Sequence, residues 1–527
     1  MSSQTSTPSP ASDKLDRGVL LVAGVVVLGA IMSILDITVV SVAQPTFQRV
    51  FDATPAQTAW TMTGYTLALA SVIPLTGWAA DRFGTKRLYM LAVALFAGGS
   101  VLCAAADSIA MLTAFRVLQG LGGGMLMPLG MTIMTRAAGP ERIGRVMAVL
   151  GVPMLLGPIF GPILGGWLID IASWNWIFLI NLPIGIIAFV YALVVLPSDS
   201  PTPSETFDFL GMLLLSPGLA LFLYGVSSTP EAGTLLAAKV LVPAAIGLAL
   251  IVVFVLRSLF RAPDHPLIDL HLFRNRALTI AVIAMSLFAV AFFGASLLFP
   301  SYFLQVRGET TLQAGLLLAP QGIGAMLTMP VAGVLTDKIG PGKIVLGGIA
   351  LIVVGLAMFT QVAVDPSAVH LTAAGVHVAA PSYPFLLGSL FVMGLGLGAT
   401  MMPIMTSALQ TLTDHEIARG STLMNITQQI AASIGTALFS VLLTNGFNGS
   451  SAIGALIKAR ETGKAVTDPS VLTTGFSDMS HAFGHAFLIG TLLVALCVVP
   501  ALMLPRRRPA ETKPDADAET VAPLLMH

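Results

Sequence analysis

The chain has 527 residues, of which 55% are hydrophobic and only 10% are charged, whereas a soluble domain carries about 25% charged residues. This composition excludes an ordinary soluble protein and is typical of a chain that lies mostly in a lipid bilayer. The 26 basic and 26 acidic residues cancel, which argues against nucleic acid as a partner.

Apolar runs long enough to cross a bilayer, which takes about 20 residues, follow one another along the chain. The predicted spanning helices are fourteen, at 18–44, 57–80, 88–106, 109–135, 146–169, 176–196, 209–228, 235–256, 278–304, 312–335, 344–363, 383–410, 420–445 and 483–504. The two runs within 209–256 give the weakest signal, because Pro217 and Pro243 interrupt them. The sequence predicts an all-α integral membrane protein.

Basic residues indicate the orientation, because they concentrate in cytoplasmic loops. Placing both ends of the chain in the cytoplasm puts most of the 26 Lys and Arg residues on the inner side. We therefore expect a cell membrane protein with cytoplasmic tails at 1–17 and 505–527. Cys103 and Cys497 lie in separate apolar runs and indicate neither a disulfide framework nor a metal site.

The first predicted helix contains a single carboxylate, Asp36, and the fourth contains a single guanidinium, Arg116. Ionisable side chains at such depth are rare, face a bundle interior or cavity, and commonly mark proton pathways. Both lie roughly 10 to 12 Å below the outer edge at 1.5 Å per residue. We predict that they share a cavity and act in proton coupling, since burial and a nearby cation shift a carboxyl pKa in opposite directions. A purely structural ion pair is the alternative.

Other residues are predicted to line that cavity. Gln119, Gly120, Gly123 and Met127 follow Arg116 at helical spacing and define one face with it. Asn425 and Gln428 are polar residues of the thirteenth predicted helix, for which interhelical hydrogen bonding is the alternative. The predicted cavity wall comprises Tyr65, Gln119, Gly120, Gly123, Met127, Asn425 and Gln428.

Two loops repeat one pattern, "GWAADRFGTKR" at 77–87 and "GVLTDKIGPGK" at 333–343. The shared positions are Gly77, Asp81, Arg82 and Gly84 in the first loop, with Arg87 at its end, and Gly333, Asp337, Lys338 and Gly340 in the second. The repeat predicts two related bundles of six helices, 18–196 and 278–504, with two inserted helices at 209–256. Glycine permits sharp turns, and an Asp near a helix start can pair with a base. We expect these loops to latch and release the cytoplasmic face; alternatively, they are ordinary short loops.

The fifth predicted helix, "GVPMLLGPIFGPILGG" at 151–166, is rich in glycine and proline. The residues concerned are Gly157, Pro158, Gly161, Pro162, Gly165 and Gly166. Glycines four apart let helices touch backbone to backbone, and prolines bend a membrane helix. The pattern indicates a hinge or seal between conformational states, or else a helix that only packs.

Two further observations limit the chemistry. Asp478, His481 and His485 share one helical face, but such pairs near a helix end are more often interfacial residues than metal ligands, so no metal is predicted. No GxxxxGK[ST] loop occurs, which argues against an ATP-driven pump. We expect no enzyme activity and no cofactor, with a proton gradient as the energy source.

Taken together, these stretches resemble the major facilitator superfamily, in its branch of fourteen-helix drug:proton antiporters. The resemblance rests on "LDITVVSVAQP", "GWAADRFGTKR", "RVLQGLGGG" and "GPIFGPILGG", with further similarity in "WNWIFLINLPIG" and "HPLIDLHLFRNR". It implies export of small hydrophobic, often cationic compounds in exchange for protons, with Asp36 and Arg116 in coupling and the fifth helix keeping the exchange mode. Ser41 departs from the usual Asn of that branch.

Two other functions stay open: a proton-coupled importer of a small nutrient and a lipid-handling transporter on the same scaffold. The expected partners are the substrates, protons and the bilayer, and a monomer is compatible with the sequence.

Overall fold

The computed structural model describes residues 16–139, 142–198, 207–232, 234, 236–260, 267–372, 375–378, 381–462 and 468–505. The first helices are α1 (Arg17–Val50), α2 (Pro55–Phe83), α3 (Thr85–Ala104), α4 (Ile109–Ala138), α5 (Ile143–Ile171), α6 (Trp176–Leu179) and α7 (Asn181–Val195). They are followed by α8 (Phe209–Ser227), α9 (Thr229–Ala232) and α10 (Ala238–Phe260).

The remaining helices are η1 (Leu270–Arg274), α11 (Arg276–Ser296), α12 (Leu298–Gln305), α13 (Thr311–Leu317), α14 (Ala319–Ile339), α15 (Pro341–Phe359), η2 (Thr360–Val362), η3 (Pro366–Ala368), α16 (Tyr383–Gly398), α17 (Met401–Leu409), α18 (Asp414–Asn448), α19 (Ser451–Thr462), α20 (Pro469–Leu496) and α21 (Val498–Met503). An antiparallel hairpin of β1 (Val369–Thr372) and β2 (Gly375–Val378) pairs Val369 with Val378. The all-α prediction contained no strand, and this hairpin lies between the predicted spans 344–363 and 383–410.

The predicted membrane class is confirmed. Within the described parts of the chain, 12 helices or consecutive helix pairs are long and apolar enough to cross a membrane. Helices α2 and α5 coincide with the two other predicted spans, and each has 29 residues. The number of fourteen spanning helices therefore stays a prediction.

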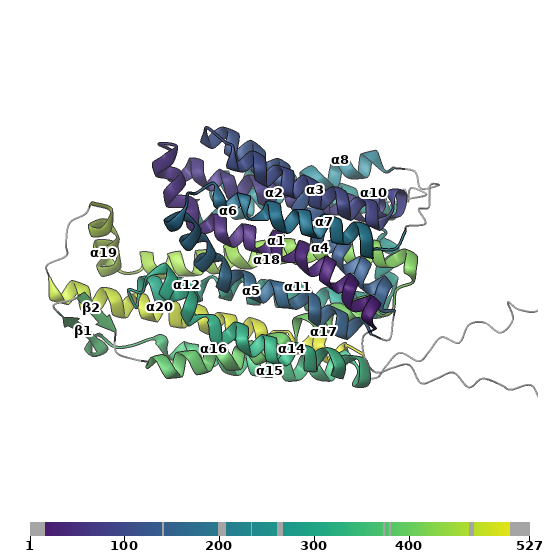
Figure 1. Ribbon diagram of the computed structural model, residues 1–527. Helices are drawn as coiled ribbons and strands as arrows, with labels where there is room; N and C mark the ends of the chain where they lie inside the picture. The colour runs from purple at the N-terminus through teal and green to yellow at the C-terminus, as the bar shows by residue number, and fades with distance from the viewer. Residues whose placement is uncertain are drawn as a thin grey trace, which may run out of the picture.

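The helices run roughly along one common direction, and α1 extends through the length of the bundle (Figure 1). We call the two ends of the bundle the Arg17 end and the Val50 end, after the first and last residues of α1. Arg142 pairs with Asp16 at 2.8 Å, and the Gly342 amide donates to the carbonyl of Pro505 at 3.0 Å. Both described ends of the chain therefore lie at the Arg17 end.

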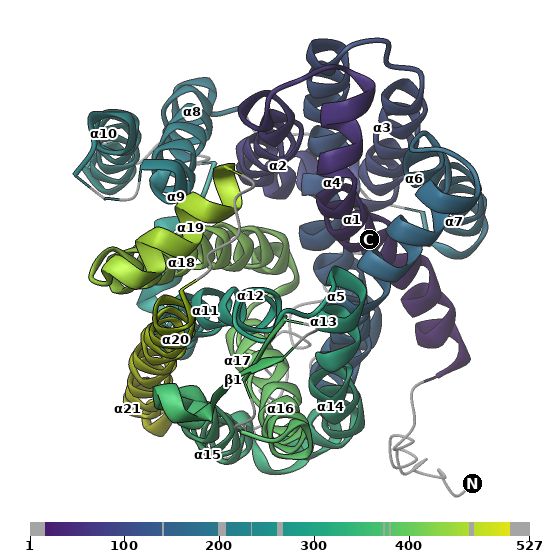
Figure 2. The same ribbon diagram turned by 90° about the vertical axis from the view of Figure 1, so that its left-hand side faces the viewer.

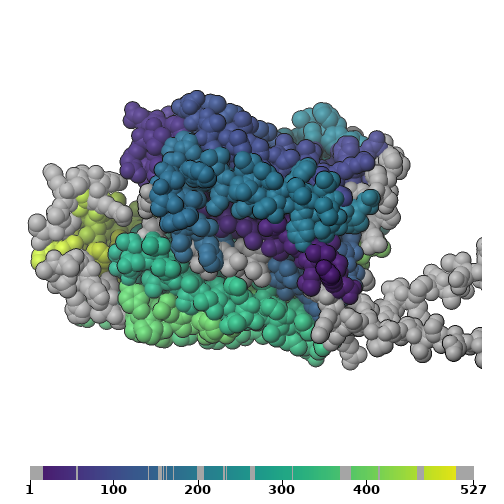
Figure 3. All heavy atoms as spheres, in the orientation of Figure 1, coloured from purple at the N-terminus to yellow at the C-terminus, as the bar shows by residue number. Residues whose placement is uncertain are grey.

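The helices form two groups, which lie side by side across the bundle. The N-terminal helices, α1 to α7, form the purple and blue upper part of Figure 3, and the C-terminal helices, α11 to α21, form the green and yellow lower part. Helices α8 and α10 lie side by side at the edge, with α8 beside α2 (Figure 2). Asp208 holds this pair together, because it caps α8 through the Gly211 amide at 2.8 Å and pairs with Arg257 of α10 at 2.8 Å.

The repeated loops have the same backbone conformation. Gly84 joins α2 to α3 with φ of 94°, and Gly340 joins α14 to α15 with φ of 86°. A positive φ is costly for residues with a Cβ, so glycine permits both sharp turns. Asp81 and Asp337 lie in the last turn of α2 and α14 rather than near the start of their own helices, because each helix continues to the residue before the glycine.

Candidate functional site

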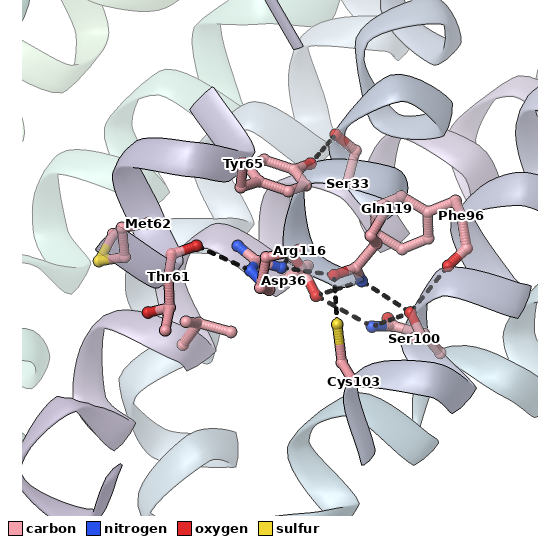
Figure 4. Close-up of polar contacts among 12 residues, drawn as sticks. Ser33, Asp36, Thr61, Met62, Tyr65, Phe96, Ser100, Cys103, Arg116 and Gln119 are labelled. Atoms are coloured by element: carbon pink, nitrogen blue, oxygen red, sulfur yellow. Dashed lines mark hydrogen bonds and ion pairs between the residues drawn. The ribbon is translucent and has the colours of Figure 1, made fainter. Parts of the chain in front are cut away.

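A buried carboxylate on α1 forms the centre of a polar cluster among the N-terminal helices (Figure 4). Asp36 is 2% exposed, and Arg116 on α4 is 0% exposed. Oδ2 of Asp36 accepts a hydrogen bond from Nη1 of Arg116 within an ion pair. The structure thus brings together the two ionisable residues that the sequence placed at similar depth.

Two amide side chains also donate to Asp36. Nε2 of Gln119 lies 2.8 Å from Oδ1, and Nδ2 of Asn181, the first residue of α7, lies 3.2 Å from the same oxygen. Both amides also reach the hydroxyl of Ser100 on α3, at 2.7 and 3.3 Å. Oε1 of Gln119 accepts from Nη1 of Arg116 at 2.6 Å. Four helices therefore position the charged pair and its donors.

Helix α2 holds the other side of Arg116. Its Nε donates to the Thr61 carbonyl at 3.1 Å, and its guanidinium carbon lies 4.1 Å from the centre of the Tyr65 ring. Its Nη2 has no hydrogen-bond partner among the described residues. The Tyr65 hydroxyl lies 3.4 Å from that of Ser33. Ser33 in turn lines a cavity between the two groups of helices, which is described below. The cluster is therefore linked to the cavity wall through Tyr65 and Ser33.

Sequence reasoning missed Asn181 and Ser100. Asn181 stands as a lone amide in the apolar stretch "WIFLINLPIG", and an unexplained amide at that depth was the available signal. Ser100 gave none, because membrane-helix hydroxyls commonly bond to their own backbone, as Ser100 does to the Phe96 carbonyl at 3.0 Å.

A cavity of about 780 Å³ lies between the N-terminal and the C-terminal helices. Gly123 and Met127 of α4 and Asn425 and Gln428 of α18 line it, where the sequence had placed them. Its lining includes Pro45 near the end of α1 and Leu304 near the end of α12, so it extends toward the Val50 end.

Three residues predicted for the cavity wall are not among those that line it. Gln119 binds Asp36 and is 0% exposed, and Tyr65 lies against Arg116. Gly120 lets α4 approach the α2 backbone, since an added Cβ would collide with the Tyr65 carbonyl. For Gln119 and Gly120 the reason is that α4 packs against other helices on several faces, so that residues of one helical stripe contact both the polar cluster and the cavity.

The glycines of α5 pack against α1 beside Asp36. An added Cβ at Gly157 would collide with Ile34, and one at Gly161 would collide with Thr38. At Gly165 it would lie 3.2 Å from the Val39 carbonyl, whereas Gly166 has no such neighbour within 4 Å. Close backbone contact therefore couples α5 to the residues that flank the carboxylate. Helix α5 continues through Pro158 and Pro162.

At the Arg17 end, Asp337 joins the two groups of helices. Its Oδ1 accepts from the Gly144 amide at 2.9 Å and its Oδ2 from the Arg145 amide at 3.3 Å, at the start of α5. A carboxylate at a helix N-terminus satisfies free amides and meets the positive end of the helix dipole. Gly333 permits the approach, since a Cβ there would lie 2.7 Å from the Gly144 carbonyl.

Asp81, the equivalent residue of the first loop, contacts side chains. Its carboxylate lies 3.5 Å from Arg136 of α4 and 3.7 Å from Arg419 of α18. Beside it, a Cβ at Gly77 would lie 3.5 Å from the Ala418 carbonyl, so α2 and α18 pack closely. Both repeated carboxylates therefore contact the opposite group of helices, and these contacts close the Arg17 end.

The other basic residues of the repeat flank these contacts. Arg82 and Lys338 lie in the last turns of α2 and α14, where a cation meets the negative end of the helix dipole. Arg87 lies in the first turns of α3 and is exposed.

The described residues contain no group of three His, Cys, Asp or Glu side chains that could hold a metal ion. In the cluster of Asp478, His481 and His485, for which the sequence predicted no metal, Asp478 accepts a hydrogen bond from Ser450 at 2.6 Å.

The model of the Major Facilitator Superfamily matches residues 26–436, which is more than half of the chain. The chain belongs to the major facilitator superfamily. The family predicted from the sequence motifs is thus confirmed.

Relatives within the superfamily carry multidrug names. The chain is 52% identical over 509 residues to the multidrug resistance protein B homolog of Mycobacterium tuberculosis (strain ATCC 25618 / H37Rv), covering 94% of this chain and 92% of that protein. It is 32% identical over 420 residues to the multidrug export protein EmrB of Haemophilus influenzae, covering 79% of each. The solved human organic anion transporter MFSD10 (TETRAN) matches with a TM-score of 0.58 at 16% identity, over 90% of this chain and 99% of that chain, a likeness of fold alone.

The charged pair can be tested by a double-mutant cycle. Arg116→Met leaves a buried carboxylate without its cation, which costs about 3 to 5 kcal/mol. In Arg116→Met combined with Asp36→Asn, the new amide can still bond Gln119 and Asn181, so we expect part of the lost stability to return. Melting temperatures of the wild type, the two single variants and the double variant in detergent measure this. A double variant that loses the sum of the single losses would contradict the pairing.

The contacts at the Arg17 end predict which of two substitutions opens this end more. Asp337 bonds to backbone amides at the start of α5, in the opposite group of helices, whereas Asp81 contacts flexible arginine side chains that can rearrange. Asp337→Asn should therefore loosen this end more than Asp81→Asn. A cysteine at Thr422, buried against Gly77, reports opening by its reaction with a membrane-impermeant maleimide in vesicles that expose the Arg17 end.

We expect at least a threefold faster reaction in Asp337→Asn than in the parent. Asp365→Asn, near the Val50 end, serves as the control with the same change of charge and should react at the parent rate. An unchanged rate in Asp337→Asn, or a larger effect of Asp81→Asn, would show that Asp337 does not hold this end closed.

Proposed function

We propose that this chain exports small hydrophobic or cationic drugs across the inner membrane in exchange for protons, by alternating access, with the Arg17 end in the cytoplasm. The observation that carries the proposal is the buried Asp36–Arg116 pair, linked through Tyr65 and Ser33 to a cavity between two groups of helices. The multidrug names of its relatives support the choice of substrate class.

Asp36 is the group that binds the proton. When ionised, it accepts hydrogen bonds from Arg116, Gln119 and Asn181, and bonds to a charged group contribute about 1.5 to 3 kcal/mol each. A proton on either carboxylate oxygen removes that acceptor and cancels the attraction to Arg116. Arg116 itself stays charged at any accessible pH, so it sets the electrostatics of Asp36 without carrying the proton.

The movement of the proton is coupled to the shape of the bundle through α1 and α5. Gly157, Gly161 and Gly165 hold α5 against the turns of α1 that flank Asp36, and the first turn of α5 is the partner of Asp337. A change in the Asp36 cluster therefore reaches the closed Arg17 end along one helix. The N-terminal bundle 18–196 and the C-terminal bundle 278–504 rock about this contact, while 209–256 stays at the edge.

Transport in everted vesicles tests the proposal. Respiration acidifies the lumen, and an exported drug should enter the vesicles while protons leave, which a pH-sensitive dye records. We expect Asp36→Asn to reduce drug-dependent proton release at least tenfold, because the amide cannot exchange a proton.

The matched control is Asp107→Asn, an exposed acidic residue at the Val50 end, which should retain wild-type release. Unchanged release in Asp36→Asn would refute the assignment of Asp36. A substrate that moves in the same direction as the protons would instead indicate an importer.

A further inference from the structure

We propose that the cavity selects neutral amphiphilic compounds that carry amide or carbonyl groups over cations of the same size and shape. The inference rests on the proposed function, since it names the preferred class within the range of hydrophobic and cationic drugs. It is carried by the absence of charge from the described cavity wall and by amide side chains without partners.

The cavity wall supplies no carboxylate to a cation. Among the described residues that line it, none is Asp, Glu, Lys, Arg or His. In the sequence, the stretch 146–169 within α5 likewise contains no ionisable residue. A cation leaves water at a cost that only an opposite charge or several good hydrogen bonds can offset. Phe292 and Phe293 line the cavity, but an aromatic ring is a weaker partner for a cation than a carboxylate is.

The nearest ionisable pair does not replace the missing carboxylate of the cavity wall. Asp36 and Arg116 lie behind Ser33 and Tyr65, and while Asp36 is ionised their charges cancel. When Asp36 takes up a proton, the charge of Arg116 stays uncompensated. The cluster therefore has a net charge of zero or above at both stages of a proton cycle, and at neither stage does it attract a cation into the cavity.

The polar groups of the wall suit a neutral ligand. Gln321 of α14 and Gln428 and Gln429 of α18 line the cavity, and the described residues offer their amides no hydrogen-bond partner. The hydroxyls of Thr38, Ser41 and Ser296 instead donate to carbonyls of their own helices, at 2.9, 2.6 and 2.8 Å. The three glutamines thus present both donors and acceptors, the combination that a ligand amide or carbonyl needs.

A matched pair of probes tests the preference by direct binding. Acridine-9-carboxamide is neutral at mildly alkaline pH, and its N-methylacridinium analogue has the same rings with a permanent positive charge. Binding of each to the purified protein in detergent is measured by fluorescence quenching, without a proton gradient. We expect the wild type to bind the neutral probe at least tenfold more tightly than the cation.

A charge-changing variant sharpens the test. Gln428→Glu keeps the size of the side chain and adds a carboxylate to the wall, so the affinity for the cationic probe should rise at least tenfold. Gln57→Glu adds the same charge in the capping box of α2, outside the cavity, and should leave both affinities unchanged.

Equal or tighter binding of the cation by the wild type would overturn the proposal, as would failure to bind the neutral probe. An unchanged cation affinity in Gln428→Glu would overturn it too. If the preference holds while drug-dependent proton release is absent from vesicles, the site assignment stands and the exchange function fails.

Discussion

The structure depends on the need to satisfy one buried carboxylate. Removing Asp36 from water costs several kcal/mol unless a cation and hydrogen-bond donors replace the water. Arg116, Gln119 and Asn181 supply them from α4 and α7, and Ser100 on α3 orients the two amides. The N-terminal helices are thereby tied together at this one buried carboxylate. Under the proposed function, the same carboxylate is the group that takes up and releases the proton.

The two repeated loops show how one sequence pattern serves two different contacts. Asp337 bonds to amides at the start of α5, while Asp81 faces the side chains of Arg136 and Arg419. The first contact uses the backbone and a helix dipole, and the second uses longer side-chain pairs that water screens more readily. The closed Arg17 end is therefore held asymmetrically, with α5 as the helix that joins this end to Asp36.

Spacing and charge placement were enough to predict the class of protein, the proximity of Asp36 and Arg116, and the turns at Gly84 and Gly340. They could not predict which way α4 faces its neighbours, so Gln119 and Tyr65 were assigned to the cavity although they surround the charged pair. Helical spacing fixes which residues share a stripe, but the rotation of a helix about its axis depends on contacts with helices distant in sequence. Asn181 was missed for that reason, since its role exists only once α7 lies beside α1 and α3. The β1–β2 hairpin escaped notice because its strands are only four residues each.

The central claim is that Asp36 binds the proton that is exchanged for drug. It is tested most directly by adding a drug to the purified protein in weakly buffered detergent and following proton release with a pH indicator. We expect drug binding to release protons from the wild type, whereas Asp36→Asn should bind drug without releasing them. Equal proton release from wild type and Asp36→Asn would contradict it.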